Sequence, residues 1–149
     1  MINKYIKQLE DLLNISIEIQ ISLKGKFEKI ESYNLVYVKN SEGSIFKIIS
    51  NNTIISQFKL IQMIGCCGIC VSTGVYVHNE YRNKGVNTIL NNFRIDIAKE
   101  LGYGILLCTD VAHNTAEVKT LDKNGWKHIY NFKNPRTSNN INISIKELN

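Results

Sequence analysis

Hydrophobic and polar residues in the first half of the chain follow the period of one helix and then of several strands. From Asn3 to Leu13 the apolar residues recur on one helical face, which predicts an amphipathic helix. The isoleucines from Ile15 to Ile21 then alternate with polar residues, as in a strand with one buried face. Ser41-Glu42-Gly43 is typical of a hairpin turn between two further strands. The predicted strands after the first one span residues 34–40, 44–50, 53–63 and 66–77.

The second half of the chain alternates between helices and strands. Apolar residues from Val86 to Leu101 have helical spacing, and Gly102 is a typical stop signal for that helix. Ile105 to Cys108 is a short, continuous apolar run, which predicts a buried strand. A second helix follows, and then two strands at residues 126–132 and 141–145 around an Asn-Pro turn. The order β-α-β-α-β-β favours a mixed α/β domain.

The second of these helices has recognisable signals at both ends. Asn114 is a typical N-cap residue, and Glu117 follows three positions later, which gives an approximate capping box. Asn124-Gly125 is typical of a helix C-terminus. We therefore expect a helix that begins after Asn114 and ends at Asn124-Gly125.

Length and composition are those of one compact domain. The chain has 149 residues, 44% of them hydrophobic and 21% charged, and no Pro- or Ser-rich linker divides it, so we expect one domain over residues 1–149. No apolar run reaches about 18 residues, so we expect neither a transmembrane helix nor a membrane partner. The N-terminus carries Glu10 and Asp11, unlike a signal peptide. We expect a soluble, cytoplasmic protein that is a monomer or a homodimer.

The net charge of +5 and the isoelectric point near 9.0 do not by themselves indicate a nucleic-acid-binding protein. The 18 basic residues are scattered along the chain, and no block of like charges occurs among them. A moderately basic surface suits any anionic ligand, including a nucleotide. We therefore expect an anionic ligand and consider nucleic acid the less favoured partner.

Four cysteines occur in the chain, and two of them form the CxxC pair Cys67–Cys70. Such a pair can indicate metal or redox chemistry. This one lies in an apolar stretch, no second CxxC accompanies it, and the three histidines are isolated from one another. We therefore expect no metal site and interpret the cysteines as small hydrophobic residues in a reducing compartment.

The stretch that is most informative about chemistry joins the strand ending at Val77 to the helix beginning at Val86. Such a loop leaves several backbone N–H groups unpaired at a helix N-terminus, where they and the helix dipole form a site for an anion. Gly85 permits close approach of the backbone, and Arg82 and Lys84 add charge that suits a phosphate. The alternative is an ordinary strand-to-helix turn with a solvated basic tip.

The same stretch resembles a family signature. Residues 82–87, Arg-Asn-Lys-Gly-Val-Asn, follow the pattern Q/R-x-x-G-x-G/A, which is the acyl-coenzyme A (acyl-CoA) binding signature of the GNAT superfamily of N-acyltransferases. Val77 to Tyr81 match the common lead-in V-x-P-x-x, with Asn79 in place of Pro. Asn87 departs from the second Gly or Ala of the signature, but an Asn keeps its backbone N–H, so we expect binding to be retained.

The resemblance implies both a fold and a cofactor site. The fold is a mixed, mainly antiparallel central sheet in which two parallel central strands splay apart, with flanking helices. Backbone amides from about residue 82 to residue 88 hold the pyrophosphate, and the backbone of the preceding strand binds the pantetheine arm. The cofactor-binding residues that the resemblance implies are Tyr76, Val77, Arg82, Asn83, Lys84, Gly85, Val86, Asn87, Thr88 and Asn114.

A second motif of the same family follows at the expected distance. The family pattern is N-x-x-A-x-x-x-Y-x-K-x-G-F/W, and Leu121 stands at the position of its Tyr. In many relatives that hydroxyl can protonate the leaving CoA thiolate, so we expect slower catalysis here rather than none. Each match also has a purely structural explanation, as a cap, a helix stop or a core residue. The matching residues are Asn114, Lys123, Gly125 and Trp126.

The resemblance implies transfer of an acyl group, most simply acetyl from acetyl-CoA, to a primary amine of a small molecule or a protein. Candidate catalytic side chains follow the strand at residues 105–108, namely Asp110 as a base, Cys108 and His113. Each also has a purely structural explanation: Asp110 as an exposed carboxylate at the strand end, Cys108 as buried packing and His113 as an ordinary loop residue. The alternative function is a catalytically impaired domain of this fold that binds CoA, or a macromolecular partner through its basic surface. Residues 133–139 also resemble small acyltransferases of bacteriophages and prophages.

Overall fold

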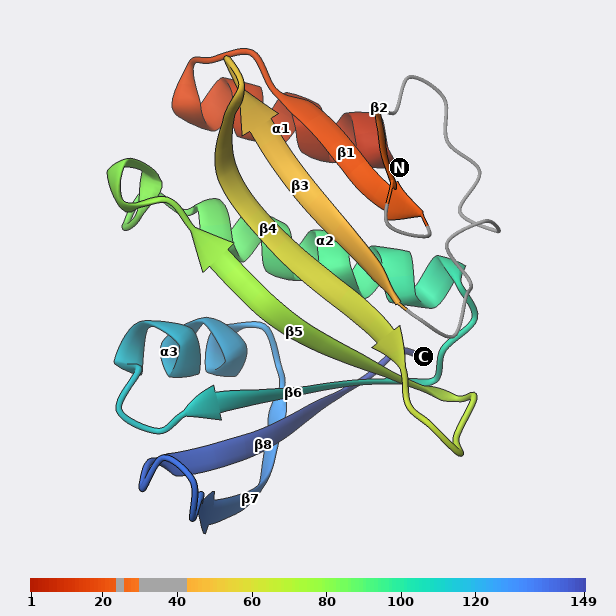
Figure 1. Ribbon diagram of the computed structural model, residues 1–149, viewed down its shortest axis with the longest axis vertical. Coiled ribbons are helices and arrows are strands. Elements are labelled where there is room, and N and C mark those ends of the chain that lie inside the picture. The colour runs from red at the N-terminus through yellow and green to blue at the C-terminus, as the bar shows by residue number, and fades with distance from the viewer. Residues whose placement is uncertain (24–25, 30–42) are drawn as a thin grey trace.

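One mixed sheet forms the centre of the molecule, and helices pack against it (Figure 1). This computed structural model describes residues 1–23, 26–29 and 43–149. In chain order the elements are α1 Ile2–Leu13, β1 Glu18–Leu23, β2 Lys26–Lys29, β3 Ser44–Ser50, β4 Thr53–Gln62, β5 Ile69–Val77, the short 3-10 helix η2 Asn79–Tyr81, α2 Val86–Glu100, β6 Ile105–Val111, α3 Thr115–Lys123, β7 Lys127–Lys133 and β8 Asn140–Glu147. The eight described strands are ordered β2-β1-β3-β4-β5-β6-β8-β7.

The first predicted strand begins later than the alternating isoleucines suggest. Asn14 ends α1 in the left-handed conformation, with a φ of 54°, and turns the chain. The backbone N–H of Ile17 then donates to the Glu10 carboxylate, with an N···O distance of 3.0 Å. This connection is therefore bound to the helix, and β1 begins only at Glu18.

The other predicted elements are confirmed wherever the structure describes them. The predicted helices are α1, α2 and α3, and the predicted strands of the second half are β6, β7 and β8. The strand expected at residues 66–77 begins at Ile69, because residues 63–68 form the turn that follows β4. The strand expected at residues 34–40 and the turn residues 41 and 42 lie outside the described residues. No helix in the described ranges is long and apolar enough to cross a membrane.

Neighbouring strands run antiparallel throughout the described sheet, except between β5 and β6. The parallel ladder is short and extends from the pair Ile69–Ile105 to the pair Ser72–Cys108. Beyond Cys108, β6 pairs only with β8 among the described strands. The predicted mixed, mainly antiparallel sheet with one parallel pair is therefore confirmed.

A bulge in β5 lies directly after the parallel ladder. The pairing of β4 with β5 shifts register between Lys59–Thr73 and Gln57–Tyr76, so that β5 carries one more residue than β4 over this interval. Gly74 lies in the bulge with a φ of +62°, a conformation that residues with side chains rarely adopt. Because a bulge bends its strand, the end of β5 is directed away from β6. Figure 1 shows the two strands diverging.

Aromatic side chains join α1 and α2 to the face of the sheet that they cover. The Phe93 ring of α2 stacks on Tyr5 of α1, with the ring centroids 4.7 Å apart. It also meets Phe46 of β3 and Phe58 of β4 edge-on, at centroid distances of 6.1 and 5.6 Å. The Tyr5 hydroxyl donates a hydrogen bond to the Asp96 carboxylate of α2. Phe93 is therefore the common contact of two helices and two strands.

We expect Phe93→Ala to lower the free energy of unfolding by about 3–5 kcal/mol, because the fully buried ring would leave a cavity among four elements. Urea denaturation followed by circular dichroism measures this change. Ile64→Ala is the control, since that side chain is 98% exposed and its truncation removes no packing. Similar losses in the two variants would show that the aromatic cluster does not hold the helices on the sheet.

Candidate functional site

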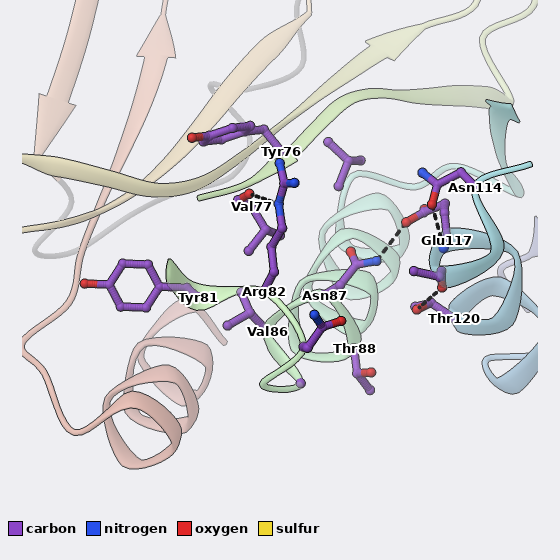
Figure 2. Close-up of a pocket in the computed structure, with 14 residues that line it drawn as sticks. Tyr76, Val77, Tyr81, Arg82, Val86, Asn87, Thr88, Asn114, Glu117 and Thr120 are labelled. Atoms are coloured by element: carbon purple, nitrogen blue, oxygen red, sulfur yellow. Dashed lines mark hydrogen bonds between the residues drawn. The ribbon is translucent and has the colours of Figure 1, made fainter. Parts of the chain in front are cut away.

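A cavity of about 470 Å³ lies between the free end of β5 and the N-terminal ends of α2 and α3. It forms where β5 and β6 have separated, and its volume is in the usual range for sites that take small molecules or cofactors. Figure 2 shows side chains from all three elements directed toward it. Its lining consists of Val75, Tyr76, Val77, Tyr81, Arg82, Asn83, Gly85, Val86, Asn87, Thr88, Asn114, Ala116, Glu117 and Thr120.

The loop between η2 and α2 presents a row of backbone donors to this cavity. Gly85 is the N-cap of α2 with a φ of +89°, and Asn83 is also left-handed, with a φ of 58°. None of the backbone N–H groups from Asn83 to Thr88 donates a hydrogen bond to another group of the described chain. Together with the positive end of the α2 dipole, these donors form a site for an anion.

The two cations of this loop have different roles in the structure. The Arg82 Nε donates to the Val77 carbonyl at 2.8 Å, which joins the loop to the end of β5 (Figure 2). The rest of its guanidinium remains at the cavity. Lys84 does not line the cavity, and its Nζ lies 5.7 Å from the centroid of the Tyr81 ring. Lys84 is therefore the one residue of the implied cofactor set that the structure leaves outside the lining.

The two backbone positions expected to bind an extended ligand are engaged differently. The Tyr76 carbonyl accepts a hydrogen bond from the Ser56 hydroxyl of β4, so this group is directed into the sheet. The next carbonyl, that of Val77, is the one bound by Arg82 at the cavity. The edge of β5 that borders the cavity is thus formed by Val75 and Val77, for which no pairing with β6 exists.

A buried polar cluster lies beside the cavity and joins its walls. Arg94 of α2 is fully buried, its Nη1 donates to the Ser72 hydroxyl of β5 at 3.1 Å, and its Nη2 is 4.0 Å from the Glu117 carboxylate of α3. Burial lowers the pKa of Arg94, and the negative charge of Glu117 opposes that shift. The other carboxylate oxygen of Glu117 accepts from the Asn87 Nδ2 at 2.7 Å.

The sequence patterns did not identify Arg94 and assigned Glu117 only to the helix cap. Arg94 lies four positions after Leu90 and directly after Phe93, within the apolar stripe of α2. A charged residue inside such a stripe indicates a buried charge that needs a partner, and this could have identified Arg94 from the sequence.

Glu117 stands at the Ala of the N-x-x-A motif. The predicted N-cap is confirmed, since the Asn114 side chain accepts from the Glu117 N–H at 3.4 Å. The capping box is not completed, because the Asn114 N–H donates to the Val111 carbonyl and the Glu117 carboxylate binds Asn87 instead.

None of the three candidate catalytic side chains lines the cavity. Cys108 is buried beside Arg94, and burial raises the pKa of its thiol to about 12. Asp110 is buried on the same face of β6 and accepts from the Asn142 Nδ2 at 3.1 Å. Burial raises the pKa of Asp110, and the Asn142 hydrogen bond opposes the shift. His113 is exposed in the loop after β6, so the catalytic roles of these residues stay predictions.

The second motif is largely structural. Leu121 is buried, and it has no group that could give a proton to a ligand. Trp126 is buried as well, and its indole N–H donates to the Asn91 side-chain oxygen at 2.9 Å. Gly125 is left-handed with a φ of +71°, as expected of a helix stop. Among the described residues no group of three or more His, Cys, Asp or Glu could hold a metal ion.

Solved structures with the same fold are numerous and distant in sequence. Bacillus cereus IAA acetyltransferase superposes with a TM-score of 0.66 at 14% identity, over 89% of this chain and 100% of that protein. An N-acetyltransferase from Staphylococcus aureus gives 0.64 at 20% identity, over 72% and 69%. The yncA structure from Salmonella typhimurium, solved with its cofactor acetyl-CoA, gives 0.63 at 15% identity and covers 72% of this chain. The chain spans 66% of that last protein, slightly under two thirds of its length.

Sequence comparison gives a more direct assignment. No curated protein sequence matches this chain significantly. The family model described as Acetyltransferase (GNAT) family matches residues 11–126, which is well over half of the chain and includes both motifs and the whole cavity lining. This chain belongs to the GNAT family of acetyltransferases.

Proposed function

We propose that this protein transfers an acyl group, in the first place acetyl, from acyl-CoA to a primary amine of a small molecule or a protein. The observation that carries the proposal is the row of unengaged N–H groups from Asn83 to Thr88, placed at a cavity where two central strands diverge. Membership of the acetyltransferase family supports the same activity. Such donors fit a pyrophosphate, because they are aligned with the helix dipole and carry no other hydrogen bond.

The residues at the cavity have distinct tasks in this proposal. The amides of Asn83 to Thr88 hold the pyrophosphate, and the free nitrogens of Arg82 add charge to the same site. The open edge of β5 at Val75 and Val77 binds the pantetheine arm through backbone groups other than the Val77 carbonyl, which Arg82 holds, and Asn114 lies on the opposite wall. Acyl-CoA supplies an activated thioester. The chain itself supplies orientation and a place sheltered from water.

Proton transfer is the weaker part of the proposed machinery. The amine must lose a proton, and Asp110, Cys108 and His113 are the proposed groups for this, directly or through water. Leu121 gives no proton to the departing thiolate, and general acid catalysis contributes about 10²–10⁴-fold. We therefore propose a slow enzyme whose rate depends mainly on holding the thioester and the amine together.

Gly85→Asp should abolish binding of acetyl-CoA, because it places a negative charge among the donors for the pyrophosphate. Any side chain is strained at the φ of +89° of Gly85, but Asp is among the residues that adopt a positive φ most readily and no atom lies within 3.4 Å of an added Cβ, so we expect α2 still to form. Gly85→Asn has nearly the same shape without the charge, and we expect it to bind at least about tenfold more tightly than the Asp variant. Isothermal titration calorimetry with acetyl-CoA gives the affinities, and circular dichroism confirms folding.

Two results would contradict this account. Equal affinities of the Asp and Asn variants would place the pyrophosphate away from Gly85, and failure of the folded wild-type protein to bind millimolar acetyl-CoA would remove the proposed function. Binding without release of free thiol, across a broad panel of amines and peptides, would instead support the impaired domain, which the buried Leu121 favours.

Asp110→Asn should stabilise the protein more at neutral pH than at acidic pH. The raised pKa means that folded Asp110 keeps its proton to a higher pH than unfolded Asp110, so the wild type loses stability as pH rises through this interval. The asparagine side chain of the variant does not titrate, so the variant does not lose stability in this way. We expect the difference in the free energy of unfolding, variant minus wild type, to be larger at about pH 7 than at about pH 3.

Urea denaturation across that pH range measures the difference. Asp11→Asn is the control for net charge, because it removes one carboxylate from an exposed position that does not contribute to the raised pKa of Asp110. A difference that stays constant with pH, or decreases toward neutrality, would show that folding does not raise the pKa of Asp110.

A further inference from the structure

Asn87 occupies a position where a side chain could interfere with the site. It is the second residue of α2, within the row of free N–H groups, and the family signature has Gly or Ala there. Asn side chains readily hydrogen-bond the backbone N–H groups of their own and neighbouring residues. An unrestrained Asn87 would therefore compete with an anion for the same donors.

The structure shows the Asn87 side chain turned toward α3 instead (Figure 2). Its Nδ2 donates to the Glu117 carboxylate at 2.7 Å. Because a carboxylate only accepts hydrogen bonds, Glu117 also decides which end of the amide faces it. The Asn87 Oδ1, which is the atom able to accept from a backbone N–H, is buried and has no partner among the described residues.

Glu117 is itself held in place from two sides. Its backbone N–H is bound by the Asn114 cap, which fixes the first turn of α3. Its second carboxylate oxygen lies 4.0 Å from the Nη2 of Arg94, which has no exposed side-chain surface and is anchored on Ser72. A lone carboxylate at this wall would repel a phosphate, and the buried guanidinium compensates that charge.

We propose that Glu117 is a positioning residue that keeps the Asn87 side chain away from the N-terminus of α2, so that the backbone donors stay available to the pyrophosphate. The inference rests on the proposed function, because it acts through binding of acyl-CoA. It gives one explanation for two departures from the family motifs, at Asn87 and at Glu117. Asn87 in place of Gly or Ala does not weaken binding, because Glu117 stands in place of the motif Ala and holds the Asn87 amide.

Calorimetric titration with acetyl-CoA of matched variants tests the inference. Glu117→Ala releases the Asn87 side chain, which can then bind a backbone N–H in place of the pyrophosphate. We expect the affinity for acetyl-CoA to fall roughly five- to tenfold, as the loss of about one hydrogen bond would cause. Glu117→Gln keeps an oxygen that accepts from Asn87, so its affinity should stay within about twofold of the wild type. Both variants remove the charge partner of Arg94, so their thermal stabilities should fall together while their affinities differ.

The decisive comparison uses a background without the Asn87 amide. In Asn87→Ala protein, the same Glu117→Ala change should alter the affinity for acetyl-CoA by less than about twofold, although it destabilises the fold as before. A purely structural role of Glu117 would give the same loss of affinity in both backgrounds. If Glu117→Ala fails to fold, the pair Arg94→Met/Glu117→Met removes both charges together, which is often tolerated, and the comparison is made with and without Asn87→Ala in that protein.

Each outcome has a defined meaning. Tight binding by the wild type with equal affinity of the Ala and Gln variants would overturn the positioning role and leave the proposed function standing. Loss of affinity that Asn87→Ala does not relieve would also overturn it. Absence of acetyl-CoA binding by the wild type would overturn the proposed function first, and the positioning role with it.

Discussion

The end of parallel pairing between β5 and β6 after Ser72 and Cys108 is the constraint on which the site depends. Up to this point the sheet is continuous, and beyond it the bulge at Gly74 bends β5 away while β6 stays paired with β8. The separated edge of β5 leads directly into the loop that caps α2. One local irregularity therefore provides both an open strand edge and a helix N-terminus facing the same space.

A gap between two central strands of a sheet has to be filled or supported, and here the support is polar. Arg94 reaches from α2 to Ser72, the last residue of β5 that pairs with β6, and to Glu117 on α3. Burying a guanidinium is unfavourable unless its charge is compensated, and Arg94 depends on one hydrogen bond to Ser72 and the ion pair with Glu117, since its Nε and Nη2 donate no hydrogen bond within the described residues. The Arg94 side chain thus connects the three elements that form the cavity walls. A change to Arg94 would alter the position of Glu117, and through the Glu117–Asn87 hydrogen bond it would affect the loop at the start of α2.

Hydrophobic periodicity and turn residues were sufficient to predict most of the fold, because the amphipathic α1 and the buried strand β6 have unambiguous patterns. The loop at Gly85 was predictable for a related reason, since a strand, a glycine and a helix start leave free donors whatever the surroundings. The contact between Arg94 and Glu117 could not be predicted from the sequence, because these residues belong to different helices and come together only in the tertiary fold. The same limit applies to Asp110, whose burial depends on which face of β6 the helices cover.

Amide hydrogen exchange with and without CoA tests the central claim most directly, because it reports on individual backbone N–H groups. The amides from Asn83 to Thr88 have no acceptor in the described chain, so they should exchange rapidly in the free protein. Saturating CoA should slow their exchange selectively, with smaller effects along the open edge of β5. Saturable CoA binding that leaves the exchange of these amides unchanged would contradict the account.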